Sequence, residues 1–432
     1  MDRMSVLSDD LILKILSFVP SKDAVTTTLL SKRWSDLWKH VPKLWYTDPH
    51  KDTEHWRASR FVDKFLLLHN KAPVLETLHV SVSRNCPPTD IETWVRIAVS
   101  RGLRNLQFHQ NRPCDAPIRL PRSLYTCESL VTLRLHHAII VDVPLKICFP
   151  SLKLLVLIAV DFSSDEIFLR LLSGCTVLQK LAMVICSYGN VKKSFTIAVP
   201  SLESLLIMDS KSGSQVPGDD VGIVVNAPSL KLLNIANRFQ WVCSLVHLPK
   251  LVIANIKLRV GNPTKLLGCL TSARHLSLCL KKPQMDSYPI GVFTQLVSLK
   301  LCACSSDWLC LILRQTPKLR VLRFQLQVIL IPCLQNINER CFSSTGEVQT
   351  QWERPSSVPK CLISSLETVE WIDYKGTEAE KKVLMYLLEN SRKLKKMAIR
   401  PLKSTILEDR YKMLQEVSSM ERISSKCRLW FT

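Results

Sequence analysis

The chain has little glycine and no long apolar run. Its 11 glycines in 432 residues leave little material for a Gly-rich loop that cradles phosphates, and no such loop is found. A membrane-spanning helix needs about 18 consecutive apolar residues, and none is present. The chain begins Met1-Asp2-Arg3 and continues at once into an amphipathic pattern, without a signal-peptide core. We therefore expect no nucleotide enzyme and no membrane or secreted protein, and place the chain in the cytoplasm, the nucleus or both.

Groupings that could bind a metal are also scarce. The densest thiol cluster, Cys302-x-Cys304 with Cys310, lacks paired C-x-x-C spacing and a nearby histidine, so buried thiols are favoured over a zinc site. The 16 cysteines are scattered along a chain without an export signal and are interpreted as reduced thiols.

Two pairs of adjacent polar residues carry little more chemistry. His136-His137 directly follows a predicted strand, where neighbours point to opposite faces, and surface or loop histidines are favoured. Asp219-Asp220 lies in a Gly-bearing stretch and is interpreted as loop decoration. The sequence thus predicts no catalytic residue, no metal and no cofactor.

The charge balance is basic, with 58 Lys and Arg against 37 Asp and Glu and a net charge of +21. One dense basic run exists, and it alternates with apolar residues: Lys393, Lys395, Lys396 and Arg400. Such alternation favours a solvated face beside a buried strand over a phosphate-binding patch, and an acidic protein partner would suit the same surface. We do not expect nucleic acid as the partner, although a basic nucleic-acid-binding solenoid remains an alternative.

The first 45 residues are dominated by apolar residues at helical spacing. One set follows the helix-start residues 8–10 and consists of Leu11, Ile12, Ile15, Leu16 and Val19. Pro20 should end that helix, and Ser21 can cap a second one. A third set consists of Trp34, Leu37, Trp38 and Val41. Three short helices bury too little surface for a comfortable independent domain, so either the rest of the chain or another protein completes the packing.

Three phrases of this stretch resemble the plant form of the F-box. They are Asp2-Arg3-Met4-Ser5-Val6-Leu7-Ser8-Asp9-Asp10-Leu11, Lys22-Asp23-Ala24-Val25-Thr26 and Leu30-Ser31-Lys32-Arg33-Trp34-Ser35-Asp36-Leu37-Trp38. The resemblance implies docking on the Skp-type adaptor of a cullin-RING ubiquitin ligase, and through it on the cullin. It assigns adaptor contact to Leu7, Ser8, Leu11, Ile12, Ile15, Leu16, Leu30, Ser31, Trp34 and Trp38. The family usually has Pro in place of Ser8, and we expect the serine still to cap the helix.

The body of the chain repeats Leu-x-x-Leu-x-Leu. The repeats start at Leu75, Leu103, Leu130, Leu152, Leu178, Leu202, Leu230, Leu251, Ala273, Leu296, Leu319, Leu366 and Leu394. Steps of 21 to 28 residues, with one step of 47, fit the period of leucine-rich repeats. Alternating apolar residues predict strands with one buried face, and the long crossovers make those strands parallel. We expect an irregular solenoid with strands on the concave face.

Helical signals lie between some of the strands. Residues 89–92 lead into Trp94, Ser163-x-x-Glu166 can form a capping box, and residues 61–69 suggest a coupling helix between the first segment and the array. The outer side of the solenoid should therefore be partly helical, with loops elsewhere.

The chain changes character near its C-terminus. Residues 335–352 are polar and are interpreted as a loop. Trp352-Glu353-Arg354-Pro355 and Leu366-Glu367-Thr368-Val369-Glu370-Trp371 resemble the FBD module of plant F-box proteins. Thr377-x-x-Glu380 can form a capping box. The repeat pattern nevertheless continues through this module, so we expect the same array to run on and to be capped by residues 406–431.

These observations predict an α/β chain: F-box at 1–47, coupling segment at 48–72, leucine-rich repeats at 73–334, loop at 335–352, and FBD module with cap at 353–432. The resemblance implies a non-catalytic substrate receptor, with a repeat scaffold that has no ligase linkage as the other alternative. Exposed positions of the inner sheet should bind an unidentified protein substrate, and an acidic segment is favoured. Candidate contacts are Thr132, Arg134, Ser204, Ser298, Lys300 and Arg323.

Overall fold

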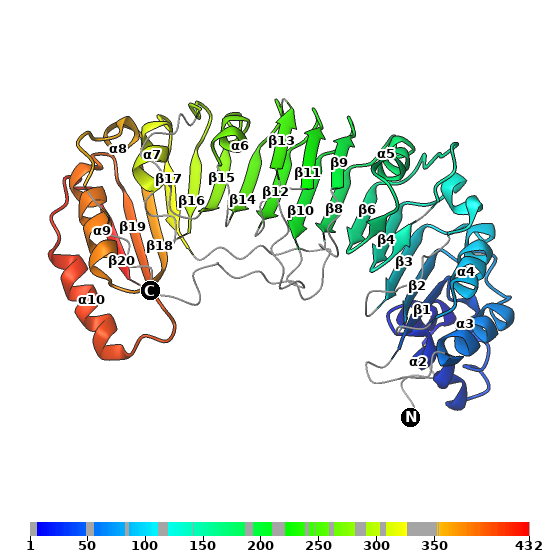
Figure 1. Cartoon of the computed structure of the whole chain (residues 1–432). Coiled ribbons are helices and arrows are strands. Elements are labelled where there is room, and N and C mark those ends of the chain that lie inside the picture. The colour runs from blue at the N-terminus through cyan, green and yellow to red at the C-terminus, as the bar shows by residue number, and fades with distance from the viewer. Residues whose placement is uncertain are drawn as a thin grey trace. The chain divides into compact units, whose positions relative to one another are not determined.

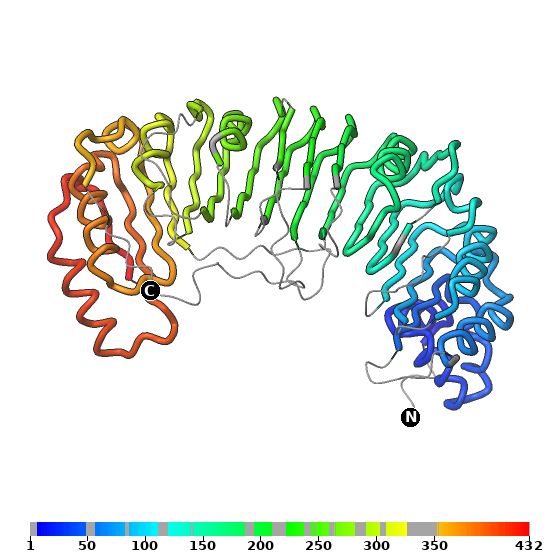
Figure 2. Tube along the Cα trace, in the orientation of Figure 1, coloured from blue at the N-terminus to red at the C-terminus, as the bar shows by residue number. Residues whose placement is uncertain are grey.

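The structure, a computed structural model, describes most of the chain. The described residues are 7–48, 56–82, 86–110, 120–140, 142–185, 193–209, 221–237, 242–246, 248–258, 263–280, 291–302, 308–325, 352 and 354–431. The chain divides into two compact units, Met1–Ala227 and Pro228–Thr432, which are considered one at a time. Each unit is built on parallel strands, whose order can be followed along the chain in Figures 1 and 2.

The first unit contains a sheet in which each strand pairs with the next repeat. Its strands lie in the order β1 (Lys43–Thr47), β2 (Thr77–Val82), β3 (Asn105–Gln110), β4 (Thr132–His136), β6 (Leu154–Ile158), β8 (Lys180–Ile185) and β10 (Ser204–Asp209). All of these neighbours are parallel. The predicted parallel sheet is confirmed.

The repeat spacing fixes where each strand begins. Leu75 lies two residues before β2 and Leu202 two residues before β10, and the other predicted repeat starts hold the same place. Each of these side chains is buried, because it ends the crossover and turns into the core. Val41 holds the same place before β1, although the sequence pattern assigned it to a helix. The first strand of the sheet therefore lies inside the stretch that resembles an F-box.

Helices cover one face of this sheet. They are α3 (Trp56–Leu68), α4 (Pro88–Ser100), η3 (Arg122–Thr126) and α5 (Asp165–Ser173). The predicted coupling helix is confirmed as α3, and the helix expected around Trp94 is confirmed as α4, both on the outer side of β1 to β3 (Figure 1). The predicted cap at Ser163 is wrong by one residue, because Ser164 caps α5 and accepts from the Ile167 amide at 3.4 Å.

Short strands, which the sequence patterns did not predict, replace helices in other crossovers. They form two small parallel pairs, β5 (Ile139–Ile140) with β7 (Asp161–Phe162) and β9 (Lys193–Ala198) with β11 (Val221–Asn226). These short strands stand where other crossovers have helices. The outer layer is therefore partly helical, as expected, and partly β-structure.

The N-terminal helical segment, residues 7–42, departs from the prediction in detail. It contains α1 (Asp9–Leu16), α2 (Ser21–Thr26), η1 (Thr27–Leu29) and η2 (Leu37–His40). The predicted third helix is shortened to the single 3-10 element η2, because Val41 already leads into β1. Ser8 stands at the N-cap of α1 but makes no side-chain capping bond. Ser21 lies inside α2, and its Oγ accepts from the Trp45 amide at 2.8 Å, which joins α2 to β1.

The second unit repeats the same arrangement. Its parallel strands lie in the order β12 (Leu232–Asn237), β14 (Ile253–Leu258), β15 (His275–Leu280), β16 (Ser298–Leu301), β17 (Val321–Phe324), β18 (Thr368–Tyr374), β19 (Lys396–Pro401) and β20 (Arg428–Phe431). The remaining elements are β13 (Val242–Val246), α6 (Thr264–Gly268), α7 (Leu309–Arg314), α8 (Lys360–Ser364), α9 (Glu378–Asn390) and α10 (Leu407–Ser419).

The C-terminal segment continues the repeat sheet, as predicted. Strand β18 pairs in register with β17, and the Trp371 ring stacks on the Phe324 ring with centroids 4.2 Å apart. The predicted capping box is confirmed at the start of α9, where Thr377 and Glu380 exchange hydrogen bonds.

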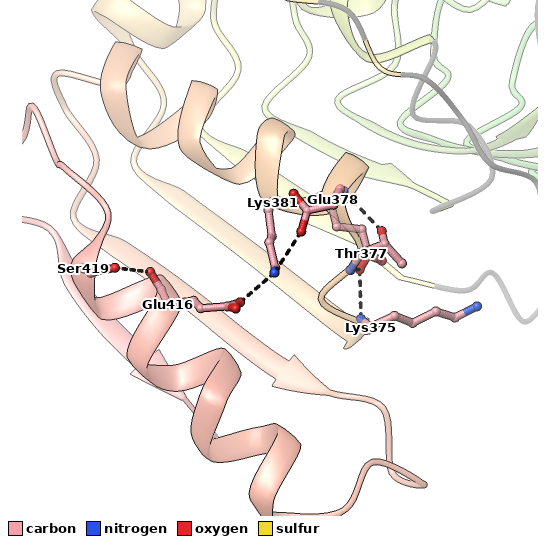
Figure 3. Close-up of polar contacts among 7 residues, drawn as sticks. Lys375, Thr377, Glu378, Lys381, Glu416 and Ser419 are labelled. Carbon is pink, nitrogen blue, oxygen red and sulfur yellow. Dashed lines mark hydrogen bonds and ion pairs between the residues drawn. The ribbon is translucent and has the colours of Figure 1, made fainter.

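Helix α10 and strand β20 close this end of the unit. Lys381 of α9 pairs with Glu378 of the same helix at 3.1 Å and with Glu416 of α10 at 2.9 Å, and the second contact joins the two helices (Figure 3). The predicted cap helix packs less deeply than its pattern indicated, because Val417 is buried while Tyr411 and Leu414 are exposed. Its apolar spacing gave the helix correctly and the buried face only in part.

Candidate docking surfaces

Helix α1 carries apolar residues on two faces. Ile12 and Leu16 face the segment's own core and are buried. Leu11, Ile15 and, just beyond the helix, Phe18 are 51%, 41% and 71% exposed. Their spacing of four and three residues places them in one line along the helix. We call this line the α1 ridge, and it leaves large apolar side chains in water in a segment whose core is already filled.

A second exposed apolar pair follows α2. Leu29 and Leu30 at the end of η1 are both exposed. Arg33, three residues on, pairs with Asp9 at 2.6 Å and also donates to the Leu7 carbonyl, which ties this stretch to the start of α1. Leu7 is half-buried, and the predicted contacts Ser8 and Ser31 are exposed.

The predicted adaptor contacts therefore fall into two groups. Leu7, Ser8, Leu11, Ile15, Leu30 and Ser31 reach the surface, whereas Ile12, Leu16, Trp34 and Trp38 are buried within the chain. The Trp38 ring lies 5.2 Å from Phe65 of α3, so this side chain joins the segment to the sheet's helical cover. Phe18 and Leu29 are exposed apolar residues that the motif did not predict as contacts. Phe18 could have been found, since it continues the line of Leu11 and Ile15 by one turn.

Polar contacts hold the N-terminal segment against α3. Asp36 binds Lys39 at 2.8 Å and Lys71 at 2.6 Å, and these two cations lower the pKa of its carboxyl to about 2. His69, just after α3, is hydrogen-bonded through Nε2 to the Val41 carbonyl at 2.7 Å, and burial lowers its pKa. The α1 ridge is thus presented by a segment fixed to the sheet.

The open face of the first sheet, opposite its helices, is polar over β1 to β4. Thr132 and Arg134, two predicted substrate contacts, are half-buried on β4. Arg134 stands in register with Gln107 of β3, which in turn stands in register with His79 of β2. Ser204 on β10 is also half-buried, but Leu206, next on the same face, is buried. Two of the three candidates in this unit therefore share one polar surface.

Histidines gather on the same face. The His109 ring lies 4.8 Å from His136 and 6.4 Å from His137 by centroid. His137 has a positive φ of 53°, so the two adjacent histidines do not alternate as they would in a regular strand. Both are half-buried: His136 ends β4 and His137 lies in the bend that follows, which agrees with the expectation of surface or loop histidines. Burial first, and neighbouring histidines second, lower the pKa of His136 to about 3.

The open face of the second sheet carries the other predicted contacts. Ser298 and Lys300 lie half-buried on β16, and Arg323 lies exposed on β17. Arg323 donates through Nε to Glu370 of β18 at 2.7 Å. Lys300 stands in register with Arg323, and Arg323 with Glu370. These residues, chosen from separate repeats, are brought onto one surface.

The predicted thiol cluster, acidic pair and polar loop add no site within the residues that the structure describes. Cys302 is buried and Cys310 half-buried, while Cys304, Asp219-Asp220 and the polar stretch 335–351 lie outside the described residues. Within the described ranges, no group of three His, Cys, Asp or Glu side chains is arranged to hold a metal ion. No helix in the described part of the chain has the length and apolar content to cross a membrane.

Family models match three parts of the chain. The F-box domain model matches residues 4–46, which include the α1 ridge. The model of the LRR repeats of FBD-associated F-box protein At5g56370 matches residues 91–260, and the FBD model matches residues 353–399. The three matches follow one another in the order in which the structure places the helical segment, the repeat sheet and the C-terminal segment.

Relatives match over the full length. The chain is 62% identical over 436 residues to the FBD-associated F-box protein At5g56440 of Arabidopsis thaliana, with 100% of both chains covered. It is 37% identical over 436 residues to the F-box/FBD/LRR-repeat protein At5g56420 of the same plant, with 100% of this chain and 99% of that one covered. It is 38% identical over 438 residues to At4g26340, another F-box/FBD/LRR-repeat protein of that plant, with both chains fully covered. The chain therefore belongs to the plant family of F-box/FBD/LRR-repeat proteins.

Proposed function

We propose that this chain is the substrate receptor of an SCF-type cullin-RING ubiquitin ligase. Its F-box docks on a Skp-type adaptor, which connects it to the cullin, and its repeat sheet binds the protein to be ubiquitinated. The observation that carries the proposal is the exposed α1 ridge in an F-box whose own core is filled. The recruited ligase supplies the chemistry, so the receptor needs no catalytic group. Such a receptor works inside the cell, in the cytoplasm or the nucleus.

The adaptor surface we propose is narrower than the motif alone implies. Leu11, Ile15 and Phe18, with Leu29 and Leu30, supply the apolar contacts because they are the ones in water. Fully burying a large aliphatic side chain contributes about 1.5–3 kcal/mol, so each half-exposed ridge residue can add about 1 kcal/mol to docking. Leu7, Ser8 and Ser31 lie at the rim. The buried residues Ile12, Leu16, Trp34 and Trp38 hold the ridge in place.

Ser8 is compatible with the proline that the family usually has. Its φ of −68° is the value that proline imposes, and the serine hydroxyl makes no capping bond that proline would remove. The Ile12 amide bonds to the Ser8 carbonyl at 3.1 Å, and a proline keeps that acceptor. Ser8→Pro should therefore leave adaptor binding unchanged or tighten it.

We propose the two open faces as the substrate-binding surfaces. In the first unit, Thr132 and Arg134 lie on a polar face, and Ser204 beside the buried Leu206 is the weakest of the predicted contacts. In the second unit, Ser298, Lys300 and Arg323 lie together. Side chains at alternate strand positions are available there because the intervening residues fill the core.

The proposal is tested by capture of the ligase components. Two purified samples, the unsubstituted chain and its Ser8→Pro variant, are each mixed with the Skp-type adaptor and the cullin. The expected result is that both samples retain the adaptor, and retain the cullin only when the adaptor is present. If the folded chain retains no Skp-type adaptor of its own organism, the ligase role is wrong, and the repeat scaffold without ligase linkage takes its place.

A further inference from the structure

Basic side chains gather on the open face of the last strands. At positions that alternate with buried residues, β16, β17, β19 and β20 carry Lys300, Arg323, Lys396, Arg400 and Arg428. We call these residues the basic face. Lys300 and Arg323 lie in the predicted leucine-rich repeats, residues 73–334. The other three belong to the C-terminal segment, so the FBD region contributes most of this surface.

The register of the strands places the basic residues in neighbouring rows. Lys300, Arg323 and Glu370 stand side by side on β16, β17 and β18. The same row continues through Ala398 to Trp430. Lys396 pairs in register with Arg428 one row below, and Arg400 pairs with Ile372 one row above. Neighbouring strands lie about 4.8 Å apart, so one bound segment can reach several of these cations.

The acidic residue within this surface positions its neighbours. Glu370 accepts from Arg323 Nε at 2.7 Å and lies 3.7 Å from Lys396 Nζ. A guanidinium has five N–H donors, and the bond to Glu370 uses the one on Nε. The terminal nitrogens are therefore oriented and keep their donors for a ligand, with a geometry that suits a carboxylate.

The surrounding cations are not neutralised in the same way. In the described part of the chain, no acidic side chain pairs with Lys300, Arg400 or Arg428. Burial, and then the neighbouring Arg323, lower the pKa of Lys300. A carboxylate placed between Lys300 and Arg323 would relieve this repulsion. The charge pattern therefore favours an acidic ligand.

An exposed aromatic ring lies beside these charges. Trp430 on the last strand is half exposed, and Lys396 Nζ is 5.9 Å from its ring centroid. Tryptophan and arginine are the residues most often found at the energetic centre of protein interfaces. This ring offers an apolar contact next to the cations.

We propose that the basic face binds an acidic protein segment, extended across the strands, whose carboxylates lie on the cations and one of whose apolar side chains lies on Trp430. Five strands span about 19 Å, the length of about six extended residues. The inference rests on the proposed function in taking this segment to be part of the substrate. A nucleic acid fits less well, because the Glu370 carboxylate would stand among its phosphates and a strand of bases calls for several stacking rings.

The test uses a fluorescein-labelled peptide of about seven residues, made of Asp and Glu with one Phe near an end because Trp430 lies on the last strand, and measures fluorescence anisotropy with the full chain. Arg400→Glu/Arg428→Glu should weaken the Kd by about tenfold or more, which is about 1.4 kcal/mol. Lys382→Glu/Lys412→Glu is the matched control, since both lysines are exposed on α9 and α10 and the net charge changes equally. This control should stay within about twofold of the unsubstituted chain.

Trp430→Ala gives an independent readout. It should weaken the Phe-containing peptide, and the loss should disappear for a peptide with Ala in place of Phe. Melting curves show whether each variant is folded. Because the substituted positions are exposed, we expect every variant to stay folded, so that a loss of affinity reports on binding.

The inference is overturned if the unsubstituted chain does not bind the peptide, or if the control loses as much affinity as Arg400→Glu/Arg428→Glu. It is also overturned if mixed-sequence single-stranded RNA binds more tightly than the peptide and loses affinity on the same variant, since the face would then bind nucleic acid. Adaptor capture is measured on the same samples. If the chain binds the peptide but no adaptor, the basic face stands and the proposed ligase role is wrong. If it binds the adaptor but not the peptide, the ligase role stands and the basic face is wrong.

Discussion

Replacing Trp371 with Ala tests whether the FBD region is a continuation of the repeat sheet. Trp371 is 3% exposed and stacks on Phe324 of the preceding strand at 4.2 Å. A tryptophan buries about 200 Å², worth about 5 kcal/mol at about 25 cal/mol per Å², before the alanine's own burial is subtracted. Measured losses for such truncations are about 3–5 kcal/mol. The indole Nε1 has no hydrogen-bond partner, so removing it relieves a desolvation cost, and we expect a value near 3 kcal/mol.

Hydrogen exchange of backbone amides, followed by mass spectrometry, is the assay that locates this loss. Trp371→Ala should speed exchange in both β17 and β18, because the two strands share the Phe324 contact and one ladder. Trp430→Ala is the matched control, since the same side chain is 52% exposed on β20 and should cost far less stability. If exchange speeds up in β18 and β19 while β17 is unchanged, the C-terminal segment is a separate domain and the continuous sheet is refuted.

Three further changes have defined outcomes. Thr377→Ala removes the capping box of α9 and should cost about 1 kcal/mol, with faster amide exchange in the first turn; unchanged exchange would mean that the box contributes nothing. Ile12→Ala should cost about 2–5 kcal/mol in chemical denaturation because the side chain is fully buried, and a cost below that of a surface substitution would refute its place in the core. His79 and His136 have their pKa lowered from 6.5 to about 4 and about 3, mainly by burial. Since the unfolded chain binds these protons more readily, the stability they contribute is complete above pH 6.5 and is lost toward pH 4 and 3. His79→Gln/His136→Gln should therefore flatten the curve of Tm against pH below pH 6.5. An unchanged slope would show that folding does not lower the pKa of the two rings.

The repeat pattern predicted the strands well because one physical rule acts at every turn of the chain. Each crossover must end on an apolar residue that enters the core, and Leu75 and Leu394 are two residues ahead of their strands for the same reason. The rule also holds for Val41, where the helical spacing of Trp34, Leu37 and Trp38 suggested a longer helix. Short stretches can satisfy both periods, and the neighbouring strand β2 decides between them.

The adaptor contacts were harder to predict, because a sequence motif does not show which of its side chains are buried within the chain and which are exposed. Trp34 and Trp38 belong to the motif but are buried, while Phe18 and Leu29 are exposed. Packing of α3 against the first segment, as in the Trp38–Phe65 contact, joins residues far apart in sequence and leaves no local signal.

The basic face shows the same limit from the other side. The basic run around Lys396 is visible in the sequence, and Lys300 and Arg323 were predicted separately as contacts on single repeats. Their assembly into one surface around Glu370 depends on strand register. The crossovers between these strands differ in length, so the sequence around Lys396 does not show which residues of the neighbouring strands lie beside it.

The central claim is that the α1 ridge docks the chain on a Skp-type adaptor, and isothermal titration of the adaptor into the full chain tests it most directly. Leu11→Ser/Ile15→Ser removes two exposed side chains worth about 2 kcal/mol together on burial, so adaptor affinity should fall by about 30-fold while Tm stays the same. Leu145→Ser, an equally apolar and more exposed position outside the F-box, should leave adaptor affinity unchanged. Adaptor affinity that is the same for the ridge variant, the Leu145 variant and the unsubstituted chain would contradict the account.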